Sequence, residues 1–278
     1  MFKKFIQICK GQYHNSDKKT LALYITLRAL VIFVLVREFF LKSYFNCFLC
    51  LLSLVLFTVP AFIEKKLKID LPNLLESIIY IFIFSAEILG EINNFYNLIP
   101  FWDTMLHTIN GFCCAAIGFS LVDILNRNSK NIQLSPLYMA IAAFCFSMTV
   151  GVMWEFFEFS GDRLFDMDMQ KDAMVSSIAS VNLNPEGLNH PVIIKGIEST
   201  ELHLADGSSY LIEGGYLDIG IIDTMKDLFV NLIGAVVFSG IGYIYVQHRD
   251  KKNFASNFIP VKVDSDEEAE DKKEKKPV

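Results

Sequence analysis

The sequence predicts an all-α integral membrane protein with six transmembrane helices and a long extracytoplasmic loop that contains a small β element. Of its 278 residues, 53% are hydrophobic and 25 are Phe, whereas soluble domains average roughly 45–50% apolar residues even when Gly is counted. Several apolar runs reach the ~20 residues that a helix needs to cross a bilayer. The short segments between these runs alternate between basic and nearly uncharged, which is typical of multi-pass membrane proteins.

Six apolar runs are expected as helices, at residues 20–41, 44–63, 72–92, 101–125, 135–159 and 220–246. The basic segment before the first run lacks a small-residue cleavage site, so we expect a retained helix rather than a signal peptide. An acidic block and then a basic block follow Asp264, which predicts a solvated, disordered tail. The predicted organisation is an N-terminal segment 1–19, helices within 20–160, a loop 161–219, a sixth helix 220–246 and a tail 247–278.

Lys and Arg in short loops predict the orientation, because they favour the cytoplasmic side of a membrane. Basic residues occur at the N-terminus, at 65–68, at 127–130 and at 249–252, whereas the intervening short loops hold only Lys42 or no basic residue. Six helices place these basic segments on one side, so both termini are predicted to be cytoplasmic. The net charge of −6 comes without a basic stripe interleaved with aromatic residues, so no nucleic-acid partner is expected.

The connection 161–219 is then extracytoplasmic and is predicted to form a folded cap. Its first part, 169–183, has the composition of a surface helix. Strands are expected at 192–194, 201–204 and 210–212, with a turn at 205–208 that contains Asp and Gly. The loop contains none of the six cysteines, five of which lie in apolar runs, so we expect small core residues rather than a disulfide framework.

Polar residues recur at three- or four-residue spacing at the predicted outer ends of four helices, where helix geometry puts them on one face. No comparable cluster is expected at the inner ends. Carboxylates in one low-dielectric pocket must bind a cation, share protons or pair with arginine. The predicted metal ligands are His107, Glu155, Glu158, Asp223 and Asp227, supported by Asp103, Asn231, Glu87, Glu91 and Asp162.

An oxygen-rich ligand set with one imidazole suits Mg²⁺, Mn²⁺, Ca²⁺ or Zn²⁺. Other interpretations stay open: Asp103 and Asp223 complement a helix dipole, His107 is a buried core residue, and Arg28 and Arg37 neutralise the acids. Glu155 and Glu158 lie towards a helix C-terminus, where the dipole does not favour acids. Because the chain lacks metalloprotease, hydrolase-elbow, P-loop and dinucleotide-binding motifs, no catalytic residue and no organic cofactor are predicted.

The region of about 100–245 resembles the YjdF-like group of bacterial membrane-spanning proteins. The order of its spaced polar residues is also similar, more distantly, to that of VanZ-like proteins, which are associated with resistance to lipoglycopeptide antibiotics. The resemblance implies a bacterial cytoplasmic-membrane protein and supplies no reaction. The matching residues are Trp102, Asp103, His107, Gly111, Gly151, Trp154, Glu155, Glu158, Asp168–Asp172, Asp223, Thr224, Asp227, Leu228, Asn231, Gly234 and Ala235.

Three functions remain in competition. The first is a site at the extracytoplasmic face that binds a divalent metal and acts on an envelope lipid or lipid-linked phosphate. The second is a proton- or cation-coupled transporter, although such carriers usually place the site near the bilayer midplane. The third is a non-catalytic structural membrane protein. All three predict a lipid bilayer as the protein's surroundings, and none fixes the oligomeric state.

Overall fold

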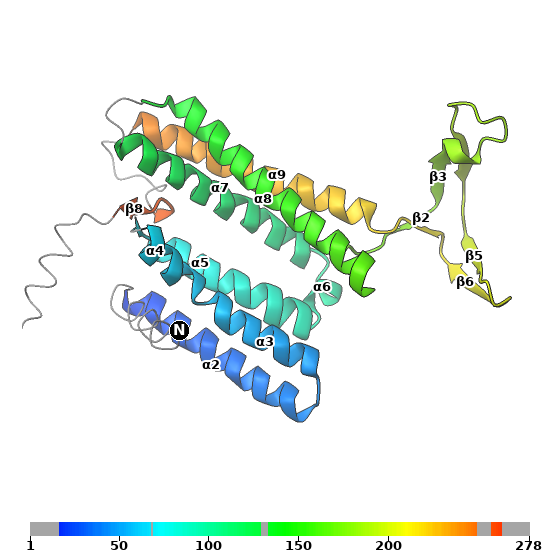
Figure 1. Ribbon diagram of the computed structural model, residues 1–278, viewed down its shortest axis with the longest axis horizontal. Helices are drawn as coiled ribbons and strands as arrows, with labels where there is room; N and C mark the ends of the chain where they lie inside the picture. The colour runs from blue at the N-terminus through cyan, green and yellow to red at the C-terminus, as the bar shows by residue number, and fades with distance from the viewer. Residues whose placement is uncertain (1–16, 68, 129–132, 249–256, 263–278) are drawn as a thin grey trace, which may run out of the picture. The chain divides into compact units, whose positions relative to one another are not determined.

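The computed structural model describes residues 17–67, 69–128, 133–248 and 257–262 (Figure 1). The basic N-terminal segment before residue 17 and the acidic and basic tail from Asp264 lie outside the described residues. Part of the basic loop at 127–130 and the basic segment 249–252 also lie outside them. The helices are α2 (Lys18–Phe40), α3 (Tyr44–Leu56), α4 (Val59–Leu67), α5 (Asn73–Ile83), the π-helix η1 (Phe84–Ile92), α6 (Phe95–Leu98), α7 (Trp102–Asn128), α8 (Pro136–Phe165) and α9 (Ile221–Gln247).

Five helical segments in the described part of the chain are long and apolar enough to cross a membrane: Lys18–Phe40, Tyr44–Lys66, Trp102–Arg127, Pro136–Phe165 and Ile221–Gln247. The six spans that the sequence predicts are therefore confirmed only in part. The third predicted span, 72–92, is helical throughout most of its length but changes from α5 to the π-helix η1 at Phe84. Neither part alone is long enough to cross a bilayer.

The second span contains a break that hydropathy does not reveal. α3 ends at Leu56 and α4 begins at Val59. Pro60 follows at once, and its missing N–H removes a helix hydrogen bond. The N–H of Thr58 instead donates to the carbonyl oxygen of Val55 at 2.9 Å, in a tighter turn.

The chain divides into two compact units, one made of residues 1–151 with 230–278 and the other of residues 152–229. In the first unit α2 contacts α3 and α5, and Figure 1 shows these helices side by side. Their core gathers Tyr24, Val31, Cys50, Phe57 and Tyr80. The five cysteines that the structure describes are free thiols, and four of them are at least partly buried. The expectation of small packing residues agrees with this finding.

A second core in this unit joins α7, α8 and α9 around Phe119, Met139 and Phe238. It also includes Phe258 and Ile259, which follow α9 and are almost fully buried. Strand β8 (Val261–Lys262) continues this segment and pairs with β1 (Ile69–Asp70). Residues 257–262 were assigned to the tail from sequence, yet two large apolar side chains dock them on the helices, since burial of each contributes about 1.5–3 kcal/mol.

In the second unit, three antiparallel pairs of strands follow the end of α8. β2 (Met174–Val175) pairs with β7 (Tyr216–Leu217), β3 (Ser177–Ser180) with β4 (Val192–Lys195), and β5 (Ser199–His203) with β6 (Ser209–Glu213). The strands predicted at 192–194, 201–204 and 210–212 are confirmed, as is the turn between the last two. The surface helix predicted at 169–183 is wrong, because Met174–Val175 and Ser177–Ser180 are paired strands and only Val181–Leu183 form a 3₁₀ turn, η2.

Candidate functional site

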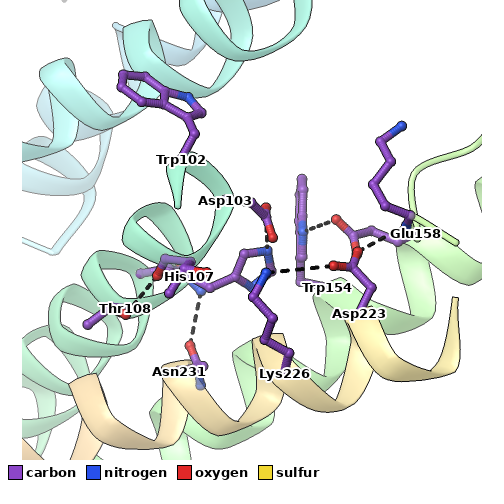
Figure 2. Close-up of polar contacts among 12 residues, drawn as sticks. Trp102, Asp103, His107, Thr108, Trp154, Glu158, Asp223, Lys226 and Asn231 are labelled. Atoms are coloured by element: carbon purple, nitrogen blue, oxygen red, sulfur yellow. Dashed lines mark hydrogen bonds and ion pairs between the residues drawn. The ribbon is translucent and has the colours of Figure 1, made fainter. Parts of the chain in front are cut away.

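Two polar residues stand one turn apart at the beginning of α7. The imidazole Nε2 of His107 lies 3.5 Å from Oδ1 of Asp103, as Figure 2 shows. Asp103 lies in the first turn of α7, where a negative charge complements the helix dipole. The indole N–H of Trp102 donates to the carbonyl oxygen of Ser85 at 3.2 Å and so fixes the start of α7 against η1. The His107 side chain is buried and has an acidic neighbour.

Glycines let α7 and α9 approach each other closely just beyond this point. A Cβ atom on Gly111 would lie 2.1 Å from the carbonyl oxygen of Asn231, and one on Gly234 would lie 2.2 Å from that of Thr108. Any side chain at these positions would force the helices apart, as at small-residue contacts between membrane helices. We call this contact, together with the polar residues Asp103, His107, Asp227 and Asn231, the α7–α9 seam.

Asn231 is the buried polar residue of the seam, with only 1% of its surface exposed. Its Oδ1 accepts a hydrogen bond from the side-chain amide of Asn110 at 3.4 Å. A Cβ on Gly151 of α8 would lie 2.6 Å from the Asn231 amide nitrogen, so α8 also packs closely on this side chain. Asp223, Asp227 and Asn231 form a polar stripe along one side of α9. At Asn231 this stripe faces a protein interior, as expected for polar residues in an apolar helix.

Asp227 precedes Asn231 by one turn of the same helix and is equally buried, at 1% exposure. One ligand atom each from Asp103, His107 and Asp227 lie within 4.8 Å of one another. We call these residues the three-ligand group. The sequence argument expects Asp227 to lie near both His107 and Glu155. A carboxylate oxygen of Asp227 lies within 4.8 Å of the His107 ring, and its approach to Glu155 stays a prediction. Asp103, which the sequence assigned to a supporting role, belongs to the group itself.

The predicted ligands on α8, Glu155 and Glu158, are both buried carboxylates. The indole N–H of Trp154 donates to Oε1 of Glu158 at 2.8 Å, one turn along the same helix (Figure 2). Burial of two acids towards the C-terminal half of α8 is costly, because both desolvation and the helix dipole disfavour the charge. The three-ligand group does not include them, and their role as metal ligands stays a prediction.

Asp223 and Asp162 hold the chain that follows α8. Asp223 accepts the backbone N–H of Lys171 at 3.0 Å and lies 3.9 Å from the ammonium of Lys226. Asp162 accepts the N–H groups of Met169 and Gln170 at 2.6 and 2.9 Å. Both carboxylates therefore hold the backbone of residues 169–171 in place. The role of Asp223 as a metal ligand stays a prediction.

Asp218 fixes the start of α9, and sequence reasoning missed it. Its carboxylate accepts N–H groups from Ala173 at 2.7 Å, Gly220 at 3.2 Å and Ile222 at 2.7 Å. Burial opposes ionisation of Asp218, yet these three bonds hold its pKa below the ordinary value of 3.8. The available signal was an Asp just before the first apolar turn of a helix, which is a typical N-terminal capping pattern.

The remaining predicted residues, Glu87 and Glu91, are one turn apart on η1. Glu91 is exposed and Glu87 is partly buried. π-Helical segments are rare and occur frequently at functional sites, but the three-ligand group contains neither residue. Their supporting role therefore stays a prediction.

Comparison with known proteins agrees with the membrane assignment. Residues 20–248 match the family described as "Predicted membrane protein (DUF2238)", and the chain belongs to this family. A Thermotoga maritima protein described as "Uncharacterized protein" is 29% identical over 113 residues, which cover 40% of this chain and 57% of that relative's length. No solved structure matches the chain. The resemblance to a family of membrane-spanning proteins is confirmed, whereas these comparisons do not support the more distant similarity to VanZ-like proteins.

Proposed function

We propose that the protein is a multi-pass protein of the bacterial cytoplasmic membrane whose three-ligand group binds one divalent cation. The single observation that carries this proposal is the grouping of Asp103, His107 and Asp227 within 4.8 Å, with His107 and Asp227 buried and Asp103 partly buried. Two carboxylates and a neutral imidazole balance the double charge of a divalent cation. Carboxylate oxygens and one imidazole suit Zn²⁺ or Mn²⁺, and also Mg²⁺ or Ca²⁺ when water completes the shell.

The number of ligands supports a reactive site rather than a purely structural one. Structural zinc sites use four protein ligands, whereas catalytic sites keep three and leave a position for water or substrate. A metal held in this way lowers the pKa of bound water and neutralises the charge of a phosphate. In this proposal, Asp103 also orients His107 by accepting its ring N–H, and the Asn110–Asn231 pair keeps α7 and α9 in register.

We further propose that the substrate is an envelope lipid or a lipid-linked phosphate at the extracytoplasmic face. The support is the position of Asp103 and Asp227 in the first two turns of α7 and α9, close to a membrane surface if these helices span the bilayer. The positive-inside rule puts that surface outside the cell and both termini in the cytoplasm. Residues 161–219 would then cap the site.

The orientation proposal needs α5 and η1 to cross the membrane together, as residues 73–92, which makes six crossings. Reporter fusions test it directly. Alkaline phosphatase fused at Gly196 should be active in the periplasm, and the same enzyme fused after residue 278 should be inactive. The opposite pattern, or activity at both fusion sites, would contradict the proposed topology.

Activity is tested with purified protein in vesicles that contain a polyprenyl pyrophosphate. We expect phosphate release that requires an added divalent cation and that falls at least about a hundredfold in Asp227→Asn, because loss of a ligand removes the metal. Asp166→Asn is the matched control, since Asp166 is exposed and has a left-handed backbone that Asn tolerates. Equal rates in wild type and Asp227→Asn would rule out this reaction.

Cation transport is a second candidate, favoured by the break between α3 and α4. Transporters often bind their ions beside discontinuous helices, and α3 ends at Leu56 within an otherwise apolar span. Flux of a divalent cation or of protons into vesicles, abolished by Asp227→Asn, would favour this function over hydrolysis. Normal folding with neither activity nor metal binding would instead favour the structural interpretation.

A further inference from the structure

Arg28 lies near the middle of α2, about 15 Å from the helix start at the usual rise per residue. A cation at such depth in a membrane-spanning helix is expensive and often marks a functional position. Its guanidinium donates to the hydroxyl of Tyr24, one turn earlier, and to the carbonyl oxygen of Leu54 at 3.4 Å. Within the described residues, Arg28 makes no ion pair with a carboxylate.

The break between α3 and α4 explains why the Leu54 carbonyl needs this donor. In a continuous helix the N–H of Thr58 would bond to Leu54, but it donates to Val55 instead. The end of α3 also carries the negative pole of its helix dipole, which favours a cation. Arg28 therefore donates to a carbonyl group at the broken end of a helix and is stabilised there without an ion pair.

The Tyr24 ring connects Arg28 to a buried carboxylate. It packs against the Tyr80 ring with centroids 5.1 Å apart, and the guanidinium carbon of Arg28 lies 5.1 Å from the Tyr24 centroid. The Tyr80 hydroxyl donates to Oε1 of Glu76 at 2.5 Å. Tyr80 and Glu76 are almost fully buried. We call these four residues, Arg28, Tyr24, Tyr80 and Glu76, the Arg28 network.

We propose that Glu76 is a proton-binding residue and that the Arg28 network is a second polar site, separate from the three-ligand group. In one state a Glu76 carboxylate accepts from Tyr80 and balances the charge of Arg28. In the other state a proton from water bonds to a carboxyl oxygen of Glu76, and Arg28 keeps its place at the end of α3. Both states are accommodated because the helix dipole at Leu56 stabilises Arg28 independently of Glu76.

A proton fits this site better than a metal ion. The network already contains the positive charge of Arg28, so a divalent cation would leave excess positive charge in a low-dielectric region. Access is short, because Glu76 lies in the first turn of α5. At that end the exposed N–H of Asp17 bonds to the side chain of Asn73 at 3.1 Å. The titratable and charged neighbours on the surrounding elements are Glu64 on α4, Asp70 on β1, Tyr24 and Arg28 on α2, Tyr80 on α5 and the thiol of Cys113 on α7.

The proposal is tested by infrared titration of the full chain in lipid bilayers. A protonated carboxyl group has its own C=O stretching band, so each buried acid can be followed as the pH changes. We expect Glu76→Gln to remove one titrating band. We expect Tyr80→Phe to move the midpoint of the same band up by about one to two pH units, since a hydrogen bond to a charged group contributes about 1.5–3 kcal/mol.

Two controls separate this outcome from general disturbance. Tyr44→Phe changes an exposed tyrosine and should leave the Glu76 band in place. Glu91→Gln removes an exposed acid of η1 and should also leave the Glu76 band in place. If Glu76→Gln fails to fold, Tyr80→Phe and Arg28→Gln still test the proposal. Tyr80→Phe removes a hydrogen-bond donor and Arg28→Gln removes a cation, so both should raise the titration midpoint of the Glu76 band. A band that persists in Glu76→Gln, or a midpoint unchanged in both Tyr80→Phe and Arg28→Gln, would overturn the proposal.

Discussion

The α7–α9 seam and the Arg28 network both bury carboxylates between membrane-spanning helices, but they balance the charge differently. In the Arg28 network, Glu76 shares a contiguous group of side chains with a guanidinium. In the seam, Asp103 and Asp227 form a group with the imidazole of His107, and each residue offers one ligand atom. The Arg28 network thus includes an arginine, whereas the three-ligand group consists of two carboxylates and one imidazole.

The helix packing differs in the same sense. α7 and α9 meet at Gly111 and Gly234, where backbone atoms come too close for any side chain. α2, α3 and α5 meet through large side chains such as Tyr24, Phe57 and Tyr80. Close backbone contact holds the seam residues rigidly, which metal ligands need. Packing through tyrosine side chains leaves hydroxyl groups that can redirect hydrogen bonds, which a proton site needs.

The largest expected effect comes from filling the close contact in the seam. Gly111→Ala places a Cβ 2.1 Å from the Asn231 carbonyl oxygen, so the helices must move apart and the protein should lose about 3 kcal/mol of stability. Gly240→Ala is the matched control, because a Cβ there meets nothing within 4 Å. It should be neutral or stabilising by about 0.5–1 kcal/mol. Thermal unfolding in detergent would compare the two, and equal melting temperatures would refute the close contact.

The substitution His107→Lys places a positively charged side chain within the three-ligand group. The ammonium would lie beside Asp103 and Asp227 and take the place of a metal ion, so the chain should fold while its metal content falls at least about a hundredfold. Elemental analysis and circular dichroism of the variant would test this directly. Retention of one metal ion per folded chain would show that His107 is not a ligand.

A smaller effect is expected from Asn231→Ala, which removes the acceptor for the side-chain amide of Asn110 and leaves that partly buried donor without this bond. The cost should be about 1–2 kcal/mol, read from the melting temperature. Asn189→Ala, at an exposed position in the second unit, is the control and should change little. If Asn231→Ala had the same melting temperature as Asn189→Ala, the side chain of Asn231 would not contribute to packing between α7 and α9.

The smallest effect concerns the start of α9 and depends on pH. Because hydrogen bonds lower the pKa of Asp218 from 3.8, its contribution of about 1 kcal/mol is fully present above that pH. The contribution is lost as the pH falls through the lower pKa of the folded state. Limited proteolysis near Ala173 should accelerate below about pH 4 in wild type and already be fast at neutral pH in Asp218→Ala. A cleavage rate independent of pH would contradict this role.

The approach of Asp227 to His107 could be predicted from sequence, since helix periodicity aligns Asp227 with Asn231 and topology brings the starts of α7 and α9 to one side. Sequence patterns also predicted the strands of the loop, because residues 192–194 are all β-branched and Leu202 and Leu204 alternate with polar residues. It did not predict the α3–α4 break or the π-helix η1, because hydropathy records length and polarity but not which backbone N–H bonds to which carbonyl.

Two other features needed the structure. Phe258 and Ile259 lie in a short segment that does not form a long apolar run, and their burial depends on contacts with distant helices that local composition does not encode. Glu76 and Tyr80 lie one turn apart on α5, whereas Arg28 lies on α2. The connection between the two helices passes through the Tyr24 ring, and no sequence pattern predicts it.

The central claim is that the three-ligand group binds one divalent cation, and the metal content of the purified protein tests this claim most directly. After exposure to Zn²⁺, Mn²⁺, Mg²⁺ or Ca²⁺ and removal of free ions, wild type and Asp166→Asn should hold about one ion per chain. Asp103→Asn, His107→Ala and Asp227→Asn should hold almost none. A folded wild-type protein that retains none of the four ions, or an Asp227→Asn variant that retains as much as wild type, would contradict the account.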